Sequence, residues 1–148
     1  MTRQDTDRKT VCDTKIEAFK HVIEVNLRYG DTDRQGHVNN AVYCTLFESG
    51  RVAFLFDGED AIGGPGTSFV IAKLTLDYLS EMNFPGIVQI ASKVISIGRS
   101  SFVVGQAAFK DGQCCSTAES VIVLFDESTR RSAPLTPEVR RRLESLVG

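Results

Sequence analysis

The chain has 148 residues, enough for one domain with a hydrophobic core, and its 42% hydrophobic and 24% charged residues are close to globular averages. The net charge of −2 gives no overall basic field for nucleic acid, and no apolar run is long enough to cross a bilayer. The first 20 residues are polar and mixed in charge, so we expect no secretory signal and no membrane association, and a cytoplasmic protein.

The cysteines do not indicate a metal site. No Cys-x-x-Cys pair occurs, and the chain has only two histidines, His21 and His37. We therefore predict no metal site and no cofactor, and thiols that are reduced and mostly buried. Cys44 is a minor candidate for a nucleophile, because it falls in a helical apolar run where a thiol usually only packs.

The first half of the chain predicts a strand followed by a buried helix. Residues 1–18 are expected to be a polar leader, and residues 19–148 a single domain. Alternation over 22–29 predicts a strand, and helical spacing predicts a helix over 40–56 whose apolar surface extends most of the way round. Such a helix belongs in the middle of a domain. The glycine-rich residues 57–67 end it and are a candidate for a mobile lip over a site.

The second half predicts a sheet. Strands are expected at 68–80, 87–97, 102–109 and 117–125, with turns at 98–101 and 111–112. In the first of these strands one face should carry Val70, Ala72, Leu74, Leu76 and Tyr78. After a basic loop at 126–134, Thr136 and Pro137 predict the start of a short helix over 137–146. We expect an α+β domain in which four strands form an antiparallel meander and one sheet wraps one long central helix.

The polar segment at 28–43, "RYGDTDRQGHVNNAVY", lies between the first strand and the central helix. Its beginning, from Asp31 to Gly36, is similar to the start of an EF-hand calcium loop. That loop needs a glutamate at its twelfth position, which here is Val42, and the segment is flanked by a strand and a helix instead of two helices. Calcium binding is therefore disfavoured.

Two other interpretations of this segment stay open from the residues alone. Asn39 or Asn40 can simply cap the helix, with His37 as a structural histidine. Alternatively, the free N–H groups and positive dipole end at about Asn40 can stabilise an oxygen that becomes negative during a reaction. Asp33, a few residues upstream, could reach the same point. A carboxylate that faces a polarised carbonyl is the minimum requirement for ester or thioester hydrolysis.

The segment also carries a resemblance to a known family. The pattern Asp31-Thr-Asp33-x-x-Gly36-His37-Val-Asn39-Asn40, followed by Tyr43 and Phe47-Glu48-Ser49, resembles the hot-dog-fold acyl-CoA thioesterases of the 4-hydroxybenzoyl-CoA thioesterase-like group. The plant acyl-carrier-protein thioesterases are relatives. "KLTLDYLSEMNFPG" at 73–86 and "IGRSS" at 97–101 also fit, and the resemblance covers roughly residues 20 to 130. It implies the hot-dog fold.

The resemblance implies roles for individual residues. Asp33 matches the catalytic carboxylate, and the backbone N–H of about Asn40 matches the donor that polarises the thioester carbonyl. His37 matches a histidine of the plant relatives' catalytic set, although that position is apolar in the 4-hydroxybenzoyl-CoA enzymes. Gln35 stands where the plant relatives carry an asparagine. Glu48 matches a glutamate in their helix, which makes it a candidate catalytic residue that supports the site; alternatively, it only pairs with Arg51.

The same resemblance implies substrate-binding residues and partners. The candidate substrate-binding residues are Gly36, Asn39, Tyr43, Arg99, Ser100, Arg130 and Arg131, the arginines as phosphate ligands for coenzyme A. We expect an acyl-CoA hydrolase that forms a homodimer or homotetramer with its site at the subunit boundary. The alternatives are a non-catalytic module that binds an acyl group or small ligand, and an acyl-carrier-protein thioesterase with a basic docking patch.

Overall fold

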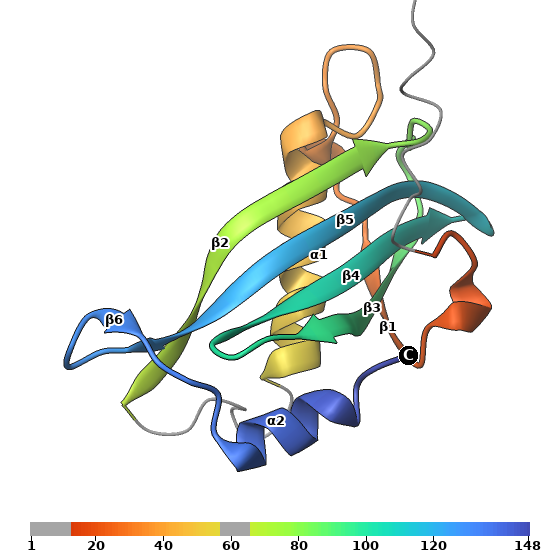
Figure 1. Cartoon of the computed structure of the whole chain (residues 1–148). Helices are drawn as coiled ribbons and strands as arrows, with labels where there is room; N and C mark the ends of the chain where they lie inside the picture. The colour runs from red at the N-terminus through yellow and green to blue at the C-terminus, as the bar shows by residue number, and fades with distance from the viewer. Residues whose placement is uncertain (1–12, 57–65) are drawn as a thin grey trace, which may run out of the picture.

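The computed structural model describes residues 13–56 and 66–148. Most of the expected leader and nearly all of the expected lip at 57–67 lie outside the described residues. Figure 1 shows a curved antiparallel sheet around one long helix. In chain order the elements are a 3₁₀ turn (Ile16–Ala18), β1 (His21–Asn26), a 3₁₀ turn (Tyr29–Asp31), α1 (Asn40–Leu55), β2 (Thr67–Tyr78), β3 (Ile87–Ile97), β4 (Ser101–Lys110), β5 (Gln113–Asp126), β6 (Arg131–Ser132) and α2 (Pro137–Glu144).

The strand order of the sheet corrects one prediction. The order is β1-β3-β4-β5-β2, with β6 added to β5. Strands β3, β4 and β5 form the expected meander, but β2 pairs with β5 and not with β3. The chain leaves β1, crosses the concave face as α1, and therefore enters the sheet at the opposite edge (Figure 1). β2 is consequently an edge strand.

A bulge in β2 corrects a second prediction. The register between β2 and β5 shifts between Ile71 and Lys73, so the alternation of inward and outward side chains breaks at Ala72. Leu74 and Leu76 pack against the core as expected, whereas Val70 is 42% exposed. The first half of the strand therefore contributes Phe69 to the core but presents Val70 and Ile71 to solvent, whereas Leu74 and Leu76 of the second half pack inward.

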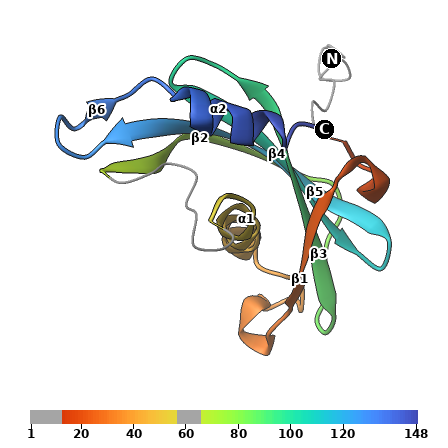
Figure 2. The same cartoon turned by 90° about the horizontal axis from the view of Figure 1, so that it is seen from below.

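Helix α1 lies on the concave side of the sheet (Figure 2). Its buried residues are Tyr43, Leu46, Phe47, Gly50, Arg51, Phe54 and Leu55. The other side is uncovered in the single chain: Val52 is 51% exposed, Phe56 is 43% exposed, and Cys44 is exposed where we expected it to pack. The helix is central, as predicted, but it is not enclosed on all sides by its own chain.

Gly50 marks the closest approach of α1 to the sheet. A Cβ atom at this position would lie 2.5 Å from Ile90 Cγ2 and 2.8 Å from Gln106 Nε2. Gln106 is fully buried and donates through Nε2 to the carbonyl of Phe47 (3.0 Å) and to Ser92 Oγ (2.9 Å). The absent side chain therefore allows the helix backbone to lie directly on β3 and β4.

The outer face of the sheet is covered by α2 and by the N-terminal part of the described chain (Figure 2). Thr136 caps α2 by accepting from the Val139 N–H (3.2 Å), with Pro137 in the first turn, which confirms the predicted start of this helix. Phe19 packs edge-on against Phe109, and Ile16 contacts the same cluster. The described end of the expected leader thus contributes to the core.

The polar turn between β1 and α1 is held by one buried carboxylate. Asp31, 4% exposed, accepts hydrogen bonds from the Arg28 backbone N–H (2.7 Å), Nη2 (2.9 Å) and Nε (3.2 Å). Its carbonyl accepts from the Asn39 N–H (2.8 Å), and the Val38 N–H donates to the carbonyl of Met82 (2.8 Å). Asp31 therefore joins the two ends of the turn, and Val38 attaches the turn to the connection after β2.

The close approach at Gly50 predicts the effect of a methyl group there. In an open helix Gly→Ala stabilises by up to about 1 kcal/mol, whereas overpacking costs about 1–3 kcal/mol. We expect Gly50→Ala to lower the free energy of unfolding by about 1–2 kcal/mol in urea titrations. Gly30→Ala is the matched control, because a Cβ at Gly30 meets no atom within 4 Å. Equal stability of the two variants would contradict this packing.

The buried Asp31 carboxylate predicts a pH-dependent contribution to stability. The hydrogen bonds from Arg28 lower the pKa of Asp31 below its usual value. Its contribution is therefore full above the unfolded-state pKa of about 4 and is lost as pH falls through the lower folded-state value. Asp31→Asn should be less stable than wild type at pH 7, and the difference should shrink in urea titrations at successively lower pH.

The control for this experiment is Asp111→Asn, which changes a carboxylate that is 89% exposed in the β4–β5 turn. A loss of stability in Asp31→Asn that is the same at every pH would show that the carboxylate charge is not what holds the turn.

Candidate functional site

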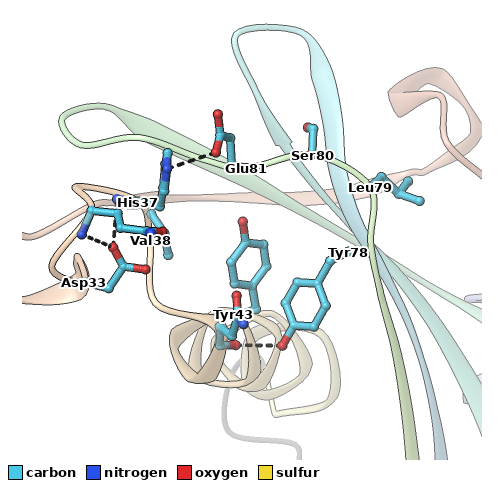
Figure 3. Close-up of a pocket in the computed structure, with 10 residues that line it drawn as sticks. Asp33, His37, Val38, Tyr43, Tyr78, Leu79, Ser80 and Glu81 are labelled. Carbon is cyan, nitrogen blue, oxygen red and sulfur yellow. Dashed lines mark hydrogen bonds and ion pairs between the residues drawn. The ribbon is translucent and has the colours of Figure 1, made fainter.

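A pocket of about 350 Å³ lies at the N-terminus of α1 (Figure 3). One wall comes from the polar turn and the start of the helix, and the other from the end of β2 and the residues after it. The lining residues are Asp33, Gln35, His37, Val38, Asn40, Tyr43, Tyr78, Leu79, Ser80 and Glu81. The segment selected from the sequence therefore lines a pocket together with a segment about 40 residues later in the chain.

Asp33 is held in a tight turn by main-chain groups. Its Oδ1 accepts from the N–H groups of Gln35 (2.8 Å) and His37 (3.2 Å). The Asp33 N–H donates to the His37 carbonyl (2.7 Å), and Gly36 allows the turn because its φ is +82°. Among the described residues Oδ2 of Asp33 has no hydrogen-bond partner. The carboxylate is therefore fixed through one oxygen and can act through the other.

The start of α1 offers a free donor to the same pocket. Asn39 caps the helix, because its Oδ1 accepts from the Ala41 N–H (2.9 Å) and its carbonyl accepts from the Val42 N–H (2.9 Å). Within the described part of the chain, nothing accepts a hydrogen bond from the Asn40 N–H. This group lies at the positive end of the helix dipole, where an anionic oxygen is stabilised.

His37 connects the two walls of the pocket (Figure 3). Its Nε2 lies 3.0 Å from Glu81 Oε2, and its Nδ1 lies 2.9 Å from Asn83 Oδ1. Both ring nitrogens of His37 therefore lie within hydrogen-bond distance of an oxygen from the segment that follows β2. Glu81 and Asn83 were not predicted as site residues, although Glu81 and Asn83 both fall in the segment 73–86 that carries the family resemblance.

Two tyrosines complete the pocket. Tyr43 is 2% exposed, and the ring of Tyr78 meets it edge to face, with centroids 5.0 Å apart. Burial raises the pKa of Tyr43 and that of Tyr78, so both phenols keep their protons at neutral pH. Tyr78 donates from its hydroxyl to the Asn40 carbonyl (2.9 Å). The single hydroxyl proton of Tyr78 is thus used in this hydrogen bond.

The structure does not bring Glu48 to the pocket. It is exposed on α1, eight residues beyond Asn40, which is about 12 Å along the helix axis. Its expected ion pair with Arg51 is not formed between these two described residues. Arg51 turns instead toward the sheet, where Nη1 donates to Gln106 Oε1 (3.3 Å) and Ser120 Oγ (3.5 Å).

The expected phosphate ligands lie at the other end of the sheet. The Ser100 carbonyl accepts a hydrogen bond from the Leu124 N–H, and Arg131 lies opposite Asp126 in the register of β6 with β5. Tyr78, at the pocket, pairs with Ser116. Residues 116 and 124 of β5 are about 25 Å apart in an extended strand. Within one chain, therefore, the group formed by Arg99, Ser100, Arg130 and Arg131 does not reach the pocket.

Residues 13–56 and 66–148 contain neither a metal-binding cluster nor a membrane-spanning helix. No group of three or more His, Cys, Asp or Glu side chains there is arranged to hold a metal ion. None of the helices in these ranges has both the length and the apolar composition needed to span a bilayer.

Comparison with known proteins places these features in a family. The model of the thioesterase-like superfamily matches residues 27–143. The fold is similar to that of protein PA5185 of Pseudomonas aeruginosa PAO1 (26% identity, 90% of this chain and 95% of that chain covered, TM-score 0.79). It is also similar to a predicted thioesterase of Bacillus stearothermophilus (26% identity, 86% and 96% covered, TM-score 0.78).

The fold is also similar to that of a Thermus thermophilus thioesterase, which was solved in complex with coenzyme A and zinc. The two sequences are 28% identical, with 88% of this chain and 96% of that chain covered and a TM-score of 0.78. The match to the family model covers most of the chain, including the whole pocket, α1 and the sheet from β2 to β5. The chain therefore belongs to the thioesterase-like superfamily and has the hot-dog fold.

Proposed function

We propose that this protein hydrolyses acyl thioesters of coenzyme A in the pocket at the start of α1. The observation that carries this proposal is that Asp33 and Asn40, the first residue of α1, both line one pocket. The thioesterase-like family supports thioester hydrolysis as the reaction class. The T. thermophilus relative, solved with coenzyme A, supports coenzyme A as the carrier.

The proposed reaction uses the two groups on one carbonyl carbon. The Asn40 N–H donates to the thioester oxygen, on which negative charge develops during attack. Asp33 takes a proton from water as the water adds to the carbonyl carbon, and the C–S bond then breaks to release the thiol and a carboxylic acid. Direct attack by Asp33, with hydrolysis of the resulting anhydride, is the alternative route.

We assign His37 a positioning role. Its main-chain N–H donates to Asp33 Oδ1, and its side chain is bonded to Glu81 and Asn83. The two side-chain bonds hold the turn that carries Asp33 against the opposite wall of the pocket. Glu81, which is absent from the sequence-based assignment, takes the supporting role first expected of Glu48.

The expected phosphate ligands Arg99, Arg130 and Arg131 do not reach the pocket of their own chain, which favours a dimer in which they serve the pocket of a second copy. β2 is an edge strand with exposed apolar side chains, Ile71 at 47% and Val70 at 42%. Such an edge pairs readily with a second strand. One end of β2 lies beside Asp126, near Arg130 and Arg131, and its other end lies at the pocket. We propose that two copies join antiparallel through β2, so that each supplies its arginines to the other's pocket.

The role of Asp33 is tested by Asp33→Asn in a thiol-release assay with a panel of acyl-CoA thioesters. Because a positioned general base contributes about 10²–10⁴ in rate, we expect kcat to fall by about that factor. Asp111→Asn, which changes an exposed aspartate that does not line the pocket, should retain wild-type turnover. Wild-type rates in Asp33→Asn would contradict the assignment. Saturable binding without thiol release by the wild type would identify a binding module instead.

The proposed dimer is tested by Ile71→Lys, which places a charge on the free edge of β2. We expect the wild type to be a dimer at micromolar concentration in light scattering. Ile71→Lys should be monomeric, with kcat/KM for acyl-CoA reduced because the partner's arginines are lost. The control is Val22→Lys on β1, the opposite edge, where Val22 is 36% exposed. A monomeric wild type, or a dimeric Ile71→Lys, would refute pairing through β2.

A further inference from the structure

The hydroxyl of Tyr78 joins the last residue of β2 to the first residue of α1. It donates to the Asn40 carbonyl at 2.9 Å, as the dashed line beside the helix in Figure 3 shows. Asn40 is the residue whose N–H is the proposed donor to the thioester oxygen. The contact therefore reaches the donor residue from the opposite wall of the pocket.

The hydrogen bonds around Asn40 leave its main-chain N–H without an acceptor among the described residues. The peptide between Asn40 and Ala41 is held at both ends, because its carbonyl accepts from Tyr78 and its N–H donates to Asn39 Oδ1. The preceding peptide carries the Asn40 N–H, which has no acceptor among the described residues. Helix ends fray unless such contacts hold them. Tyr78 and Asn39 thus fix the first turn while its leading N–H stays open to the pocket.

Tyr78 is itself firmly placed. Its ring meets Tyr43 at an interplanar angle of 81°, and Tyr43 is almost completely buried. The backbone on either side of Tyr78 is tied to β5, since Ser116 Oγ donates to the Asp77 carbonyl (2.7 Å) and the Leu79 N–H donates to the Cys115 carbonyl (2.9 Å). The Tyr78 hydroxyl therefore holds the start of the helix in a fixed position relative to the sheet.

We propose that Tyr78 is a positioning residue for the oxyanion donor, which it holds in place through the Asn40 carbonyl. This inference rests on the proposed function, because it assumes that the Asn40 N–H binds the thioester oxygen. It assigns Tyr78 a role in transition-state stabilisation and no direct contact with the reacting atoms. A shift of the donor by a fraction of an ångström would weaken that stabilisation with little effect on binding of the substrate.

The test is Tyr78→Phe, which removes one oxygen and keeps the ring on Tyr43. We expect kcat to fall about five- to ten-fold, the effect of one hydrogen bond, with KM within about two-fold of wild type. A trifluoromethyl ketone analogue of the acyl-CoA, whose hydrate mimics the tetrahedral intermediate, should bind correspondingly more weakly, while coenzyme A alone binds as to wild type. Tyr29→Phe is the control, because Tyr29 is 81% exposed and its ring packs on Phe84.

An unchanged kcat in Tyr78→Phe, or a loss confined to KM, would overturn the inference. Amide hydrogen exchange at residues 40–42, measured without substrate, separates this inference from the proposed function. If the wild type released no thiol from any acyl-CoA, the proposed function would fail. Faster exchange at 40–42 in Tyr78→Phe would still show that Tyr78 holds the helix start, and unchanged exchange would refute it.

Discussion

The packing of α1 against the concave face of the sheet is the constraint on which the site depends. Gly50 lets the helix backbone lie directly on Ile90 and Gln106, and Gln106 bonds the helix through the Phe47 carbonyl. The packing of the helix body therefore determines where the N-terminus of α1 lies. The first residue of α1, Asn40, lines the same pocket as Asp33 and His37, so the positive end of the helix dipole lies at that pocket.

Two aspartates of one short segment differ in role because their surroundings differ. Asp31 is buried and bonded three times by Arg28, so its charge is used to hold the turn. Asp33 is exposed and is bonded at one oxygen by main-chain N–H groups alone. The first carboxylate holds the turn, and the second keeps one oxygen available for the proposed reaction. Sequence spacing shows both residues, but only their environments separate the two roles.

Local patterns were sufficient for the two α-helices and the five long strands, but they missed β6, in the loop expected at 126–134, and the first four residues of β5. Helical periodicity predicted α1 to within one residue, and the motif placed Asp33, His37 and Asn40 around one pocket. What failed required knowledge of distant pairing. The edge position of β2 depends on which way the chain crosses the sheet, and the exposed Val70 depends on a bulge. Alternation had placed Tyr78 on the face of the strand that carries Leu74 and Leu76, but Glu81 lies beyond the strand and no local periodicity marks it.

The vibrational frequency of a bound thioester carbonyl tests the convergence of Asn40 and Asp33 most directly. A ¹³C-labelled acyl-CoA bound to Asp33→Asn, in which turnover is slow, can be measured by isotope-edited infrared spectroscopy. A carbonyl that accepts a hydrogen bond from the helix terminus should absorb at lower frequency than the same thioester free in water. A carbonyl that absorbs at the free frequency or above it would show that the helix terminus does not polarise the substrate.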